Sequence, residues 1–143
     1  MRIFYLFRKE DETGVSGTGF VAEGVKFSTG KIVMNWLSKL TSTCIYESMD
    51  DIIRIHGHNK KTEILWEDED FINEKGEPIV SDGNGYYANL LTKEYLGWFS
   101  NDAIKERNFI KISDFIAQMK DKHDAKVHKI REIMSMNPEQ FNK

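Results

Sequence analysis

Apolar positions in the first 66 residues follow the two-residue period of β-strands. Residues 3–8 carry apolar and aromatic side chains on both faces, which predicts a central strand that is covered on both sides. In the third stretch Ile32, Met34 and Trp36 share one face. The strands predicted in this way span residues 3–8, 20–27, 31–37, 43–46 and 62–66.

A helix is predicted over residues 48–57, between the fourth and fifth strands. Ser48 is a typical N-cap, and apolar residues recur behind it at helical spacing. Asp50 and Asp51 lie in the first turn, where the helix dipole favours carboxylates, and Gly57 suits the C-cap. This order of strands and helix predicts an α+β fold with an antiparallel meander in residues 1–70.

The second half divides into a turn-rich middle and a helical end. Turn residues surround two short apolar pairs, 79–80 and 86–87, which predict a small hairpin. Residues 92–99 are expected to form a helix. From Ser113, taken as an N-cap, the spacing predicts a long amphipathic helix that stops before Pro138. We expect residues 71–143 to pack on the sheet or to form an oligomer contact.

Composition narrows the class of protein. The chain has 143 residues, a net charge of −3, and no apolar run near the 18 residues that a membrane helix needs. We expect a protein of the cytoplasm with no membrane contact. Residues 1–100 hold 11 basic and 16 acidic side chains, whereas residues 101–143 hold 9 and 7. Acidic residues interleave with the lysines of the last helix, which favours a solvated face over nucleic-acid binding.

A glycine-rich loop is the first candidate ligand site. Its core consists of Ser16, Gly17, Thr18 and Gly19, whose backbone N–H groups can face a phosphate. Phosphate loops are normally followed by a helix, whereas a strand follows here. A connecting loop is therefore the favoured interpretation, and nucleotide binding is the alternative.

His56 and His58 are the second candidate ligand site. Two histidines at this spacing can share a metal, but such sites need three or four ligands. A histidine that ends a helix also meets the dipole favourably, so a structural role is preferred and no metal or cofactor is expected. Cys44 lies in an apolar strand and is expected to be a core residue. Asp68 and Asp70 are a weaker candidate pair for Mg²⁺. No catalytic residue is assigned, although a small nucleotide-processing enzyme or nuclease that uses the loop of residues 14–19 with His56 and His58 remains an alternative.

Exposed apolar side chains are the candidate interface. Four aromatic residues of the middle segment suit a protein contact: Tyr86, Tyr87, Trp98 and Phe99. The last helix carries an apolar stripe on one face, which consists of Ile116, Met119, His123, Val127, Ile130 and Met134. A stripe left in water is costly, so we expect a homodimer with His123 near the two-fold axis.

Residues 16–27 also carry a resemblance, together with Gly30, residues 36–37, 46–48 and 50–51, and the His56-Gly57-His58 segment. In order and spacing these motifs resemble a group of small proteins that are frequent in phage, prophage and archaeal-virus genomes. The resemblance covers about residues 1–66. It implies a phage-type accessory protein that works in the host cytoplasm. By analogy, such a protein binds and inhibits a host or defence-system protein, or it binds a small signal nucleotide.

Overall fold

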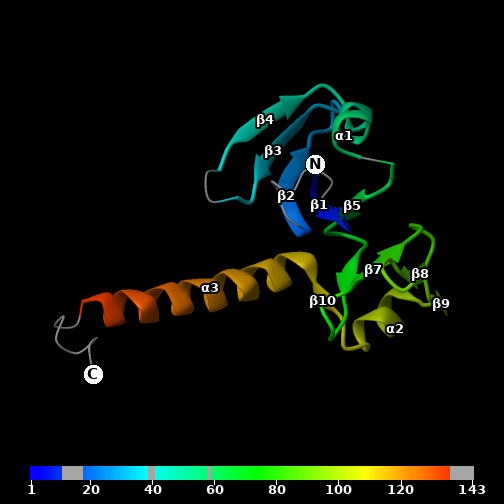
Figure 1. Cartoon of the computed structure of the whole chain (residues 1–143). Helices are drawn as coiled ribbons and strands as arrows, with labels where there is room; N and C mark the ends of the chain where they lie inside the picture. Colours follow the sequence, from blue (N-terminus) through cyan, green and yellow to red (C-terminus); the bar gives the residue numbers. More distant parts are fainter. Residues whose placement is uncertain (11–17, 39–40, 58, 136–143) are drawn as a thin grey trace.

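The computed structural model describes residues 1–10, 18–38, 41–57 and 59–135, and it contains two antiparallel sheets and a long helix (Figure 1). The α+β fold is therefore confirmed. The first sheet has the strand order β4-β3-β2-β1-β5. Its strands are β1 (Arg2–Arg8), β2 (Gly19–Lys26), β3 (Ile32–Trp36), β4 (Thr43–Tyr46) and β5 (Thr62–Trp66). All five correspond to predicted strands.

Helix α1 (Met49–His56) covers one face of this sheet. The Ser48 side chain accepts a hydrogen bond from the Asp51 N–H, and the Gly57 N–H donates to the Ile53 carbonyl, so both predicted caps are confirmed. Ile52 inserts from α1 into a core built from strand residues of the same face. That core contains Phe4, Leu6, Val21, Ala22, Ile32 and Met34.

Residues 71–111 form a second sheet, which the sequence pattern revealed only as one hairpin. Its strand order is β10-β6-β7-β8-β9. The strands are β6 (Phe71–Ile72), β7 (Pro78–Ser81), β8 (Tyr86–Asn89), β9 (Tyr95–Trp98) and β10 (Ile110–Lys111). A short helix, α2 (Asn101–Lys105), leads into β10, and α3 (Ile112–Met134) follows directly.

The prediction of a helix over residues 92–99 is wrong, because this segment contains strand β9. Tyr95 and Trp98 pair with Ala88 and Tyr86 of β8. Aromatic residues favour strands, and Gly97 has a φ of 107°, which no right-handed helix accommodates. The pairing with β8 therefore prevails over the weak helical spacing.

A second core joins the two sheets on the face of β1 that α1 does not cover. Tyr5, Phe7 and Leu65 from the first sheet pack with Ile72 and Ile112. Half-buried Phe20, Phe115 and Ile116 pack around them. The first turns of α3 are therefore part of the core, and β1 is buried on both faces as its sequence predicts.

Asp70 links the two sheets through its carboxylate. One oxygen accepts a hydrogen bond from the Trp66 N–H at 2.6 Å, and the other accepts from the Ser81 N–H at 2.9 Å. Only 3% of the residue is exposed, and burial raises the pKa of Asp70 to about 6. Asp68 instead pairs with Arg2 at the surface, so the two acids do not face a common metal position.

Substitution of Gly24 by alanine is expected to destabilise the first sheet. A Cβ at this position would lie 2.5 Å from the Phe4 ring and 2.8 Å from the Val33 carbonyl oxygen. Because Phe4 is fully buried, its ring has little room to move. We expect Gly24→Ala to lower the free energy of unfolding by about 1–3 kcal/mol in urea denaturation. Ile45→Thr, at a strand position that is 67% exposed, should change it much less. Equal stability of the two variants would contradict the packing described for β2.

The ionisation of Asp70 gives a pH-dependent stability of known sign. Because the folded-state pKa is raised to about 6, the folded protein binds a proton between about pH 4 and pH 6 that the unfolded chain does not bind. Stability from this group therefore rises as the pH falls from 7 to 5, by about 1 kcal/mol, and Asp70→Asn should lack that rise.

Asp68→Asn is the matched control for this experiment. Its partner Arg2 lowers the pKa of Asp68, so its contribution stays constant between pH 7 and pH 5 and is lost only in stronger acid. Parallel pH profiles for wild type and Asp70→Asn between pH 7 and pH 5 would show that Asp70 does not titrate as described.

Candidate interaction surfaces

Three large aromatic side chains stand uncovered on one face of the β8–β9 hairpin. Tyr86, Tyr95 and Trp98 are exposed by 47%, 66% and 59%, and we call them the aromatic patch. Tyr86 lies directly opposite Trp98, and Tyr95 lies opposite Ala88 on the same face. Cross-strand pairing thus gathers onto one surface residues that are up to 12 positions apart in the chain.

The indole of Trp98 has a fixed position in this patch. Its Nε1–H donates to the Asn84 carbonyl at 3.1 Å, and the ring lies against the turn at Gly85. A Cβ at residue 85 would lie 2.5 Å from the indole nitrogen, and its φ is 98°, so only glycine allows this approach. The turn therefore holds the Trp98 indole in place.

Tyr87 and Phe99 do not share this surface. Tyr87, expected at an interface, is buried, because alternate residues of a strand point to opposite faces. It packs with Ile79, Ile104 and Phe99 in a third core. Phe99 is half-buried there, and the Arg107 guanidinium lies 4.7 Å above its ring.

Helix α3 presents the second uncovered surface. The stripe is packed only at its start, where Ile116 contacts the core between the sheets. Beyond that point Met119, Ile130 and Met134 are exposed by 54%, 48% and 73%; His123 is exposed and Val127 half-buried. Figure 1 shows α3 leading away from both sheets. The rest of the chain, as far as the structure describes it, leaves most of the stripe in water.

The residue that follows β5, Glu67, caps the first turn of α3. Ser113 is not the N-cap, because the helix already begins at Ile112 and the preceding Lys111 makes no side-chain cap bond. The Glu67 carboxylate instead accepts hydrogen bonds from the Ser113 N–H at 3.0 Å and from its hydroxyl. A carboxylate at this end also suits the helix dipole. Burial and the Glu67 charge together raise the pKa of the neighbouring Tyr5 phenol.

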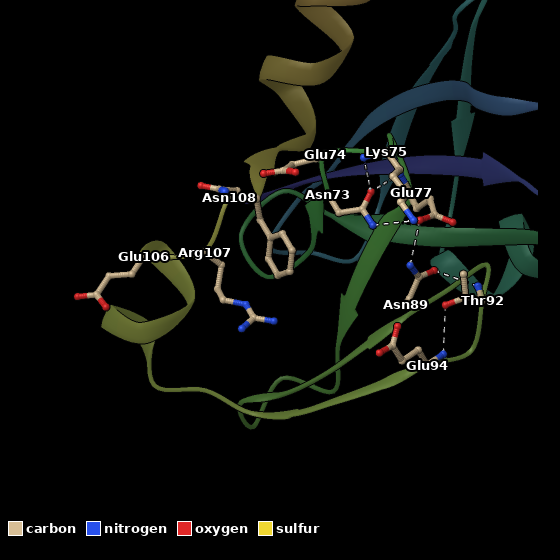
Figure 2. Close-up of a pocket in the computed structure, with 11 residues that line it drawn as sticks. Asn73, Glu74, Lys75, Glu77, Asn89, Thr92, Glu94, Glu106, Arg107 and Asn108 are labelled. Carbon is tan, nitrogen blue, oxygen red and sulfur yellow. Dashed lines mark hydrogen bonds between the residues drawn. The ribbon is translucent and has the colours of Figure 1, made fainter.

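A polar pocket of about 530 Å³ lies between the β6–β7 turn, the β8–β9 connection and the segment before β10 (Figure 2). The Asn73 side chain accepts from the backbone N–H groups of residues 75 and 77, and Asn89 accepts from those of residues 91 and 92. Both amides also donate to Glu77. Four carboxylates and two cations line the pocket, so it is unsuited to phosphate. The amides of Asn73 and Asn89 brace the turns. The sequence pattern does not predict this pocket.

The structure describes only part of the expected ligand sites. Ser16, Gly17 and His58 lie outside the described residues. Thr18 is exposed, and Gly19 begins β2 with a φ of 86°.

His56 is the last residue of α1, and its Nε2 lies 2.8 Å from the Tyr46 hydroxyl. The Trp36 ring packs edge-on against the His56 ring, with 5.0 Å between the two ring centroids. Cys44 is half-buried on the same strand as Tyr46. Within the described ranges, no three metal-ligating side chains converge.

No helix among the described residues combines the length and the apolar character needed to cross a membrane.

Known proteins match the chain only in part. No curated protein and no solved structure matches the chain. Residues 1–68 match the family described as Acb5 phage protein. This match spans the first sheet, α1 and Glu67, whereas the aromatic patch and α3 lie beyond it. The N-terminal part of the chain is thus similar to a family of phage proteins, as the sequence motifs imply.

Proposed function

We propose that this protein is a phage-type accessory protein that binds and inhibits a host or defence-system protein through the aromatic patch. The observation that carries this proposal is the exposure of Tyr86, Tyr95 and Trp98 together on one face of the β8–β9 hairpin. Tryptophan and tyrosine dominate the residues that supply binding energy in protein interfaces. They bury a large area and have few rotatable bonds to immobilise.

The surroundings of the patch support a protein partner over nucleic acid. Aromatic platforms for single-stranded nucleic acid are accompanied by basic grooves. In the segments that flank the patch, Lys93 stands beside Glu94, and Asp82 closes the β7–β8 turn. A polyanion would therefore meet acidic as well as basic side chains here.

Alanine substitution of Tyr95 and Trp98 is expected to abolish partner binding without unfolding the protein. Loss of two central aromatic contacts costs about 2 kcal/mol or more, which weakens binding roughly 30-fold. The tagged protein would be purified from phage-infected bacteria, its partner identified by mass spectrometry, and the Kd then measured with both proteins purified. Ile53→Ala, at an α1 position that is 53% exposed, is the matched control and should leave the Kd unchanged.

Two results would contradict this proposal. One is a double variant that binds its partner as tightly as the wild type. The other supports the alternative function, a nucleotide-binding sponge or small nucleotide-processing enzyme that uses the loop of residues 14–19 with His56 and His58. A nucleotide at 100 times its Kd would stabilise the protein by about 2.7 kcal/mol. A melting-temperature increase of several degrees with a cyclic dinucleotide, abolished by Gly17→Val, would favour that alternative.

A further inference from the structure

The exposed stripe of α3 is bordered by cationic side chains. Lys122, Lys126 and Lys129 recur at spacings of four and three residues, which places them along one side of the stripe. We call these three residues the lysine edge. All three are exposed, and within the described part of the chain none forms an ion pair. The described part of the chain therefore leaves the lysine edge open to other charges.

The other side of the stripe is mixed but also basic. It carries Lys120 and Arg131 with Asp124 between them. The remaining acids of the helix middle, Asp121 and Glu132, fall on the back of the helix. Five cations therefore border the stripe beside one acid, Asp124, although acids and lysines interleave evenly along the sequence.

The stripe itself continues the face by which α3 is anchored. Its positions repeat after 11 residues: Ile116 recurs as Val127, Met119 as Ile130, and His123 as Met134. An 11-residue period corresponds to about 3.67 residues per turn, close to that of a straight helix. The stripe thus runs nearly straight along α3 and forms a regular surface against which another helix can pack.

We propose that α3 binds an amphipathic helix of a partner protein whose apolar face is flanked by carboxylates. Apolar residues along the stripe supply the contact between the two helices, and the lysine edge selects an acidic segment over a basic one. This inference rests on the proposed protein-binding function and adds the chemistry of the partner. It concerns α3 rather than the aromatic patch, so the two proposals fail separately.

Charge argues against a second copy of this chain as the occupant. An antiparallel two-fold pair that matches the stripe with itself sets Met119 against Ile130 and His123 against Val127. The same register brings Lys122 beside Lys129 of the second copy and Lys126 beside its own equivalent. Like charges facing each other across a helix pair oppose association, whereas an acidic flank satisfies them.

Two synthetic helical peptides test the proposal. Both carry the same leucine face, one with glutamate flanks and the other with lysine flanks, and binding to the full-length protein is followed by fluorescence anisotropy. We expect the acidic peptide to bind at least tenfold more tightly, with a preference that weakens as salt rises. The triple variant Lys122→Glu, Lys126→Glu, Lys129→Glu should reverse the preference. Ile53→Ala, at an exposed α1 position outside both proposed surfaces, should leave it unchanged.

Three outcomes would overturn the proposal. Equal affinity for the two peptides, or no affinity for either, removes the role of the lysine edge. A dimer in light scattering that Val127→Asp with Ile130→Asp converts to a folded monomer assigns the stripe to a second copy. Binding to vesicles with anionic headgroups but not to the acidic peptide assigns it to a membrane surface. Loss of partner binding in the Tyr95 and Trp98 variant, with peptide binding intact, bears only on the proposed function.

Discussion

Strand β1 carries apolar side chains on both faces, so both faces must be covered. The rest of the structure supplies these two covers. Phe4 and Leu6 point to the core beneath α1, while Tyr5 and Phe7 point to the opposite side. A single sheet with one short helix covers only the first pair. Residues 71–116 supply the second cover, because Ile72 and Ile112 close over Tyr5 and Phe7. The two halves of the chain therefore share a core.

Hydrogen bonds at the short junction between the sheets define how the elements around this shared core are placed. Asp70 ties the end of β5 to β7, and Glu67 caps the first turn of α3. Once those turns are fixed, the 23-residue helix runs straight out of the core. Its exposed stripe is thus a consequence of where the helix begins. The match to phage proteins includes Glu67 but ends before the surfaces that we propose for binding.

The sequence pattern predicted the elements with strong local signals. The alternation in the first five strands, the Ser48 cap and the spacing of α3 all correspond to the structure. The second sheet was largely missed because β6 and β10 have only two residues each, too short for any period to show. The burial of Tyr87 cannot be predicted from the sequence, because exposure depends on which face of β8 is covered, which is a tertiary property. The lysine edge was likewise hidden, since interleaving along the chain does not reveal separation around a helix.

The central claim is that the described part of the chain leaves most of the α3 stripe exposed, and we propose that an external partner covers it. Small-angle X-ray scattering of the purified protein at high micromolar concentration tests it most directly, because it reports mass and shape together. We expect the mass of one 16.7 kDa chain and a distance distribution with a long tail, since a 23-residue helix extends for about 35 Å. A mass of two chains, or a compact distribution with no tail, would contradict this account.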